Sequence, residues 1–301
     1  MSMIQVEHLT KDYGENRGVF DLSFHTEQGE VYGFLGPNGA GKTTTIRHLL
    51  GFSKPQSGKC SILGFDCWSH AKEIQRHIGY VPGEIAFPDH LTGYEFLEQI
   101  SDLRKMSSLT KARELIDLFD LDPRGELKRM SKGMKQKIAL VTAFMHDPEL
   151  ILLDEPTSGL DPLMQERFVE LIKQERKRGK TIFMSSHMFD EVEKTCDRVS
   201  IIKEGRIITD VRIKDLEHAK EKTFEIKLAT ANEVDILASQ KFNFAEVNSE
   251  KKRVKVTIHD DEMNRLLHTL SPLNVVYMSE IKFGLEQYFM HYYQREDVSN
   301  V

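Results

Sequence analysis

The most informative segment of the sequence is Gly36-Pro37-Asn38-Gly39-Ala40-Gly41-Lys42-Thr43, which lies between the short apolar run Val31–Leu35 and a helical pattern over residues 43–50. The segment fits G-x-x-x-x-G-K-S/T, the pattern of a phosphate-binding loop between a buried strand and a helix. Its glycines allow backbone N–H groups to point inward around phosphate oxygens, and the helix N-terminus adds partial positive charge. We therefore expect a nucleotide site, with the Lys42 ammonium at the β- and γ-phosphates and the Thr43 hydroxyl on Mg²⁺.

A second segment, Leu150-Ile-Leu-Leu-Asp154-Glu155, places two acids directly after an apolar strand. In open α/β folds, ligands bind at the carboxyl ends of the strands. Asp154 is suited to holding Mg²⁺, and Glu155 is suited to positioning or deprotonating an attacking water. A GTPase is disfavoured because no base-reading N-K-x-D stretch is visible.

Strands and helices alternate through most of the chain. Apolar patterns predict strands at 4–9, 151–153 and 181–185, and a hairpin in which 199–202 and 206–209 flank Glu204-Gly205. Helical patterns cover 92–106, 110–121, 131–146 and 163–178. The first three of these helices each begin with a Ser or Thr that we expect to cap them. Alternating elements of this kind predict an α/β core with a parallel sheet.

The pattern changes after about residue 218, and we place a domain boundary there, between 1–218 and 219–301. Beyond it, strands are expected at 224–228, 242–247, 254–258 and 275–278, and helices at 233–240 and 261–270. This β-α-β-β-α-β order matches the ferredoxin-like split motif. A last helix over 285–294 carries an aromatic stripe that either packs on its own domain or binds a partner.

Composition indicates a globular protein without a membrane-spanning segment of its own. The chain has 301 residues, of which 40% are hydrophobic and 29% charged, enough to bury a core. Its net charge of −6 argues against a nucleic-acid partner. The three cysteines lack metal or disulfide spacing, which fits a reducing cytosol. We see no signal peptide and no apolar run of about 18 residues, so we expect a cytoplasmic protein.

A third segment, Met130-Ser131-Lys132-Gly133-Met134-Lys135-Gln136, resembles the signature loop of the ABC superfamily, usually written LSGGQ. Lys132 and Met134 stand where the family usually has Gly and Gln. With the two earlier segments in the family's usual order, residues 4 to about 215 resemble its whole nucleotide-binding module. The C-terminal region, including the tail 285–293, resembles the accessory domain of ATP-binding subunits of type-2 ABC exporters.

The resemblance implies a P-loop NTPase fold of the ABC type, with an α-helical subdomain at about 84–147 and a small C-terminal α+β domain. It implies roles for single residues as well. Ser131 and Gly133 match signature residues that face the γ-phosphate held by the other subunit, and His187 resembles the switch histidine that contacts the γ-phosphate. Tyr13 resembles the aromatic that stacks on adenine, and Asp161 ends a segment similar to the loop that links the two sites.

The expected site residues form two sets. Nucleotide contacts are expected from Tyr13, Gly36, Pro37, Asn38, Gly39, Ala40, Gly41, Lys42, Thr43, Thr44, Ser131, Gly133 and Asp161. Catalytic roles are expected for Glu155, His187 and Lys42, and metal ligands are expected to be Thr43, Asp154 and Glu84.

Glu84 departs from the family. After Ile78-Gly-Tyr-Val-Pro82, most relatives have a Gln that senses Mg²⁺ and couples to the membrane partner, whereas this chain has Gly83 and then Glu84. Glu84 either serves the metal, contacts the membrane partner, or points to solvent.

The implied function is an ATPase that powers transport, expected to be export, through a separate membrane permease. Two copies, or one copy with a second ATP-binding subunit, are expected to hold two Mg-ATP between them at the cytoplasmic face of the membrane. The region 84–147 is expected to face the permease. The alternative is a soluble ABC ATPase that acts on nucleic acid or the ribosome. Such relatives tend to carry two modules, long coiled coils or basic extensions, which this chain lacks.

Overall fold

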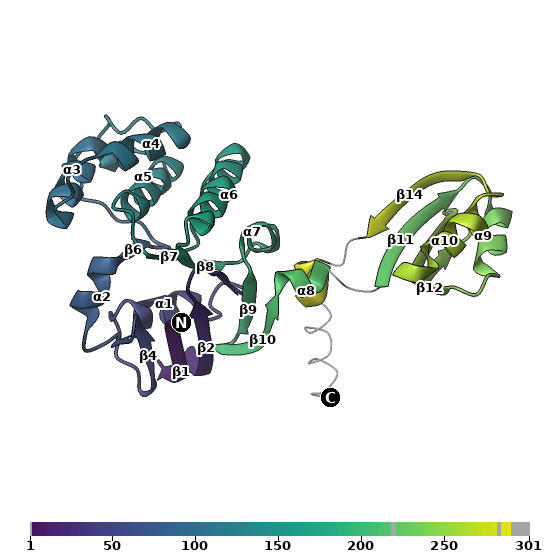
Figure 1. Ribbon diagram of the computed structural model, residues 1–301, viewed down its shortest axis with the longest axis horizontal. Helices are drawn as coiled ribbons and strands as arrows, with labels where there is room; N and C mark the ends of the chain where they lie inside the picture. Colours follow the sequence, from purple (N-terminus) through teal and green to yellow (C-terminus); the bar gives the residue numbers. More distant parts are fainter. Residues whose placement is uncertain (1, 218–220, 282–283, 290–301) are drawn as a thin grey trace. The chain divides into compact units, whose positions relative to one another are not determined.

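Parallel strands form the centre of the first of the two units into which the chain divides, Met1–Arg212 and Ile213–Val301. The computed structural model describes residues 2–217, 221–281 and 284–289 (Figure 1). The central sheet has the order β10-β9-β3-β8-β7-β6, with bounds β3 Val31–Leu35, β6 Ile78–Val81, β7 Leu150–Asp154, β8 Thr181–Ser186, β9 Arg198–Lys203 and β10 Arg206–Arg212. All neighbouring pairs are parallel except β9 and β10, which form the hairpin predicted over Glu204-Gly205.

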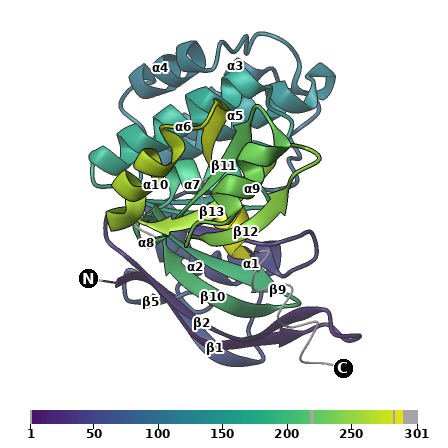
Figure 2. The same ribbon diagram turned by 90° about the vertical axis from the view of Figure 1, so that its right-hand side faces the viewer.

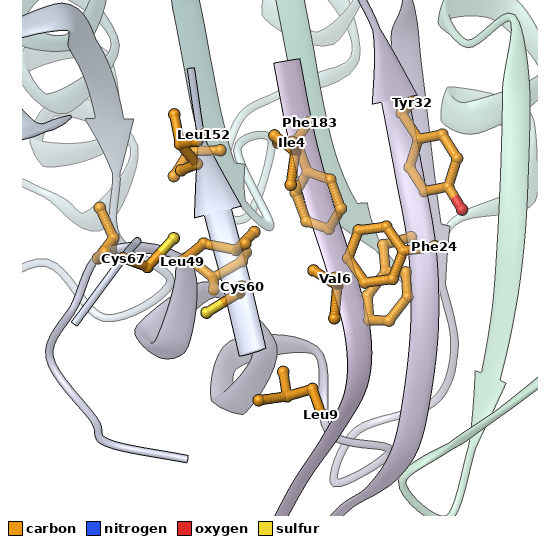
Figure 3. Packing of buried hydrophobic residues seen from close by; sticks show 14 of the residues in the cluster. Ile4, Val6, Leu9, Phe24, Tyr32, Leu49, Cys60, Cys67, Leu152 and Phe183 are labelled. Carbon is orange, nitrogen blue, oxygen red and sulfur yellow. The ribbon is translucent and has the colours of Figure 1, made fainter. Parts of the chain in front are cut away.

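A second, antiparallel sheet packs against the first. Its order is β2-β1-β4-β5, with bounds β1 Ser2–Asp12, β2 Gly18–Glu27, β4 Ser57–Ile62 and β5 Phe65–Asp66. Apolar side chains of both sheets and of helix α1 (Lys42–Leu49) form one buried cluster. Figure 3 shows part of it, where Phe24, Tyr32 and Phe183 stack with ring centroids 5.6–5.8 Å apart. This core anchors the phosphate-binding loop, which joins β3 to α1.

The helices of the first unit complete its core. They are α2 Ala71–His77, α3 Gly93–Arg104, α4 Thr110–Leu118, the 3₁₀ turn η1 Leu127–Arg129, α5 Lys132–Phe144, α6 Pro162–Lys177 and α7 Phe189–Thr195. Figures 1 and 2 show α3, α4 and α5 gathered at one end of the unit, away from β1 and β2. The Arg104 guanidinium donates to the Ile78 carbonyl at 3.2 Å, and the Lys111 ammonium pairs with the buried Glu175 carboxylate at 2.6 Å. These contacts join α3 and α4 to the rest of the unit.

Two of the three expected helix caps are present. Thr92 caps α3 in a reciprocal capping box with Glu95, and Ser131 caps α5 by accepting from the Met134 N–H at 3.2 Å. The expectation for Thr110 is wrong, because the helix begins one residue earlier than a Thr110 cap requires. Leu109 is the N-cap of α4 and makes no side-chain cap. Thr110 is already helical, so its hydroxyl is not placed to cap the first turn.

The second unit has the predicted β-α-β-β-α-β order after a short helix. Its elements are α8 Ile213–Glu217, β11 Glu221–Leu228, α9 Ala231–Ala238, β12 Asn243–Asn248, β13 Arg253–His259, η2 Asp260–Glu262, α10 Met263–Leu270 and β14 Val275–Ile281. The sheet order β12-β13-β11-β14, antiparallel throughout, is that of the ferredoxin-like motif. One face of the sheet and the two longer helices enclose a separate apolar core.

The end of the chain is described only in part. Residues 285–289 are helical, and the remainder of the helix expected over 285–294 lies outside the described residues. Among the described residues, no helix is long and apolar enough to cross a membrane.

Candidate functional site

The phosphate-binding loop is shaped by glycines that no other residue could replace without strain. Gly39 and Gly41 have φ of +81° and +108°, in the left-handed region. A Cβ on Gly36 would lie 2.3 Å from the Ile202 carbonyl oxygen. The Gly36 N–H donates to the Ser186 carbonyl at 3.1 Å, which ties the start of the loop to the end of β8. Pro37, Asn38 and Gly39, at the tip, are exposed.

Lys42, at the start of α1, folds its side chain back over this loop. Only 5% of the residue is exposed, and its ammonium donates to the carbonyls of Gly36 at 2.8 Å and Pro37 at 3.1 Å. It also pairs with the Glu155 carboxylate at 3.1 Å. The ammonium therefore lies inside the loop, where phosphate oxygens are expected. Thr43 and Thr44 follow in the first turn of α1, with Thr43 exposed and Thr44 half-buried.

Asp154, the last residue of β7, has the features of a cation ligand. It is fully buried, and its Oδ1 accepts from the Ser185 hydroxyl at 2.5 Å. Its Oδ2 has no hydrogen-bond partner among the described residues. Gly83 lies against it, since a Cβ added there would be 3.0 Å from Oδ2. A buried carboxylate oxygen without a donor is unfavourable, and a hard divalent cation satisfies it. The residues present thus fit Mg²⁺.

Glu155 joins the two other catalytic candidates. Its carboxylate pairs with the Lys42 ammonium on one side and with the His187 imidazole, Nδ1 to Oε2, at 3.2 Å on the other. Its backbone has φ of +49°, and its N–H donates to the Ser185 carbonyl at 3.1 Å. Left-handed φ is unfavourable for a non-glycine residue, so the turn after β7 directs this side chain at the expense of backbone strain. The structure thus brings Lys42, Glu155 and His187 into one cluster from three separate elements.

The N-terminus of α5 is fastened to the loop that follows Glu155. The Lys132 ammonium donates to the Ser158 hydroxyl at 2.8 Å, and the buried Gln136 amide donates to the Pro156 carbonyl at 2.7 Å. Gly133 fits against Gly159, whose carbonyl oxygen a Cβ would approach to 2.7 Å. Among the described residues, no hydrogen bond or ion pair joins Ser131 or Gly133 to the cluster of Lys42, Glu155 and His187, called the Lys42 cluster below.

The remaining expected residues lie around this centre. Tyr13 is 56% exposed, with the Lys11 ammonium 5.5 Å from its ring centroid. Asp161 caps α6 by accepting from the Met164 N–H at 3.0 Å. Glu84 is exposed.

Sequence reasoning missed two polar residues that hold the site together, Ser185 and Gln136. The Ser185 hydroxyl donates to the Asp154 carboxylate and accepts from the Glu155 N–H. The Gln136 amide donates to the Pro156 carbonyl and so fixes the loop after Glu155. A signal for Ser185 was present, because Ser185-Ser186 ends an apolar strand just as Asp154-Glu155 does. Gln136 ends the segment that resembles the signature loop, but nothing in that segment indicates its contact with Pro156.

Comparison with known proteins gives consistent matches. A family model described as "ABC transporter" matches residues 19–158. The chain is 34% identical to the bacitracin transport ATP-binding protein BcrA of Bacillus licheniformis, over 96% of each chain. It is also 34% identical to the linearmycin resistance ATP-binding protein LnrL of Bacillus subtilis, over 87% of this chain and 84% of the relative. A solved structure of an ATP binding subunit of an ABC transporter is 30% identical, with a TM-score of 0.66, and the match covers 71% of this chain and 92% of that one.

Proposed function

Since the chain belongs to the ABC transporter family, we propose that it is the ATP-binding and ATP-hydrolysing subunit of a transporter whose membrane-spanning permease is a separate chain. The observation that carries the proposal is the convergence of Lys42, Glu155 and His187 beside the phosphate-binding loop. The reaction is the hydrolysis of ATP to ADP and phosphate.

The residues divide the chemistry among them. Backbone N–H groups of the loop and the Lys42 ammonium bind the β- and γ-phosphates, and the exposed Tyr13 ring offers a face for adenine. Glu155 orients the attacking water or accepts its proton, and His187 contacts the γ-phosphate. Asp154 and Thr43 would hold Mg²⁺, which when bound neutralises charge on the phosphate oxygens. Binding ATP would displace Glu155 from Lys42, because phosphate oxygens compete for the same ammonium.

Two copies, or this chain with a second ATP-binding subunit, are proposed to close around two ATP molecules. Ser131 and Gly133 belong to this proposal, because the capped N-terminus of α5 is suited to binding an anion. Within the described part of the chain, neither residue has a hydrogen bond or ion pair to the Lys42 cluster of the same copy. The loop 156–159 would couple the two ATP sites, because Lys132 and Gln136 join it to the N-terminal part of α5. The region 84–147 would transmit closure to the permease at the cytoplasmic face of the membrane.

Export is the proposed direction of transport. The named relatives serve bacitracin transport and linearmycin resistance, and resistance to an antibiotic fits removal of a compound from the cell. These relatives give no support to the alternative of an ATPase that acts on nucleic acid or the ribosome.

The test uses two site variants and a matched control. Lys42→Ala should weaken ATP binding, because it removes the buried ammonium from the loop. Glu155→Gln should keep ATP binding and lower turnover by about 10²- to 10⁴-fold, the usual effect of a positioned acid–base group. Glu149→Gln, an exposed glutamate at the opposite end of β7, should change neither. Turnover at the wild-type rate in Glu155→Gln would refute the assigned role.

The partner is tested separately. Affinity purification of the tagged chain from membranes with ATP should recover an integral membrane protein. Recovery of ribosomes or nucleic acid in its place would favour the alternative.

A further inference from the structure

A buried acid outside the proposed catalytic set lies behind His187. Glu191, in α7, is only 6% exposed. Its Oε2 accepts from the Ser186 hydroxyl at 2.5 Å, and the same hydroxyl accepts from the Met188 N–H at 3.0 Å. One carboxyl group thereby holds both residues that flank His187 in the chain.

The loop that carries His187 also meets the segment that carries Glu155. The Thr157 hydroxyl, two residues after Glu155, donates to the Met188 Sδ at 4.0 Å, and Thr157 is itself buried. The second carboxyl oxygen of Glu191, Oε1, is buried and has no hydrogen-bond partner within the described part of the chain. Residues 155–158 form a turn, closed by the Ser158 N–H to the Glu155 carbonyl at 3.1 Å. A change at Thr157 therefore reaches Glu155 through one tight turn.

Ser186 adds a third connection, to the phosphate-binding loop. Its carbonyl accepts from the Gly36 N–H at 3.1 Å, while its hydroxyl is held by Glu191. The backbone of Ser186 thus holds the phosphate-binding loop, and its side chain donates a hydrogen bond to Glu191. Glu191 thus anchors the side chain of a residue whose backbone holds the phosphate-binding loop.

The surroundings of the Glu191 carboxyl group affect its pKa. Burial raises the pKa of Glu191 above the ordinary glutamate value, against the opposing effect of the Ser186 hydrogen bond. Glutamine has the same shape as glutamate and keeps a carbonyl oxygen that can accept from the Ser186 hydroxyl, whereas alanine has no such oxygen.

We propose, resting on the ATPase function above, that Glu191 is a positioning residue of the hydrolysis site. Its carboxyl group holds the His187 loop through Ser186, and Met188 of that loop contacts Thr157 of the Glu155 turn. It does not touch the nucleotide. Its effect is therefore on the rate of the chemical step and not on ATP binding.

The test measures kcat, KM, ATP affinity and Tm of the full-length chain in the wild type and four variants. The affinity probe is ATP with a fluorescent ribose label, in the presence of Mg²⁺. A misplacement of about 1 Å can lower a rate by about 10²-fold, so Glu191→Ala should lower kcat by about ten- to a hundredfold. ATP affinity should remain within about twofold, because Lys42 and the loop glycines are unchanged. Glu191→Gln should stay within about threefold of wild-type kcat.

Two further variants separate positioning from folding. Ser186→Ala removes only the hydroxyl that joins Glu191 to the His187 loop, and it should lower kcat in the same direction even where Glu191→Ala fails to fold. Asp190→Asn is the matched control, an exposed acid in the same turn of α7, and it should leave kcat unchanged.

Three results would overturn the proposal. Wild-type kcat in both Glu191→Ala and Ser186→Ala would refute the positioning role and leave the ATPase function intact. Equal losses of kcat, ATP affinity and Tm in the Gln and Ala variants would show a purely structural role. A wild-type chain that neither binds nor hydrolyses ATP, with its permease present, would refute the proposed function and the positioning role with it.

Discussion

At the level of single residues, the site holds its charged groups against one another. The Lys42 ammonium, which is nearly buried, is shared between two backbone carbonyls and the Glu155 carboxylate, and that carboxylate also contacts His187. A buried ammonium needs such partners. Phosphate oxygens offer Lys42 a stronger partner, so ATP would release Glu155 to act on water.

Glu84 provides a prediction about the metal. Gly83 lies next to the unpaired Asp154 Oδ2, so the residue after it is close enough in sequence to serve the same cation. If Glu84 is a ligand, Glu84→Ala should raise the Mg²⁺ concentration for half-maximal hydrolysis by about tenfold, equivalent to about 1.4 kcal/mol of binding. Glu84→Gln should keep most activity, since a carbonyl oxygen can replace the carboxylate.

The control for this titration is Asp89→Ala, an exposed acid in the same loop, which should not alter the Mg²⁺ dependence. An unchanged Mg²⁺ dependence in Glu84→Ala, with transport lost, would assign Glu84 to contact with the permease. Unchanged hydrolysis and unchanged transport would leave it a solvent-exposed residue.

At the level of elements, the role proposed for the N-terminus of α5 requires a second subunit. Glu155→Gln with ATP should shift from monomer to dimer in sizing with light scattering, because ATP is retained between the copies. Adding Ser131→Arg should abolish the shift, since a bulky side chain would occupy the anion site at the helix terminus. Ser107→Arg, at another exposed serine, should leave the dimer intact. A dimer that persists in the Ser131→Arg double variant would contradict the composite site.

Prediction of elements succeeded where local chemistry determines them. The Glu204-Gly205 turn was readable because both residues adopt positive φ, +48° and +74°, as a two-residue hairpin requires. The order of elements in 219–301 followed from clear alternation. The segments 18–27 and 189–195 were not assigned, although they form β2 and α7. β2 pairs with β1 directly before it, so its alternating burial was a local signal left unused, whereas α7 spans only seven residues, too few to show a helical period.

The site residues, like the elements, were predictable where a local sequence pattern indicates them. Residues whose chemistry is indicated by a local pattern, such as Lys42 and Asp154, could be proposed from the sequence. Glu191 and Gln136 lie inside helices and act through hydrogen bonds to residues far along the chain. No spacing in one sequence reveals such partners.

At the level of the whole molecule, the two units have separate apolar cores, and every residue placed at the site lies before residue 213. We therefore predict that a chain ending at residue 218 folds and binds ATP with an affinity within about twofold of the full-length protein, since no residue placed at the site belongs to the second unit. Isothermal titration of both chains with Mg-ATP measures this. A well-folded 1–218 chain that fails to bind ATP would show that the second unit contributes to the site.

The left-handed backbone of Glu155 has a consequence for the evolution of the molecule. Glycine and alanine at this position both lack the carboxylate, so they differ mainly in the cost of the left-handed backbone. Glu155→Gly should therefore exceed Glu155→Ala in free energy of unfolding by about 1 kcal/mol, or in Tm by about 2–4 °C. At Glu149, whose φ is not positive, the glycine variant should be the less stable of the two, as glycine is in ordinary extended chain. Thermal denaturation of the four variants checks the contrast, and a lower Tm for Glu155→Gly than for Glu155→Ala would contradict it. Every side chain that can act on water at this position carries the same backbone cost, so selection for turnover keeps a strained residue here.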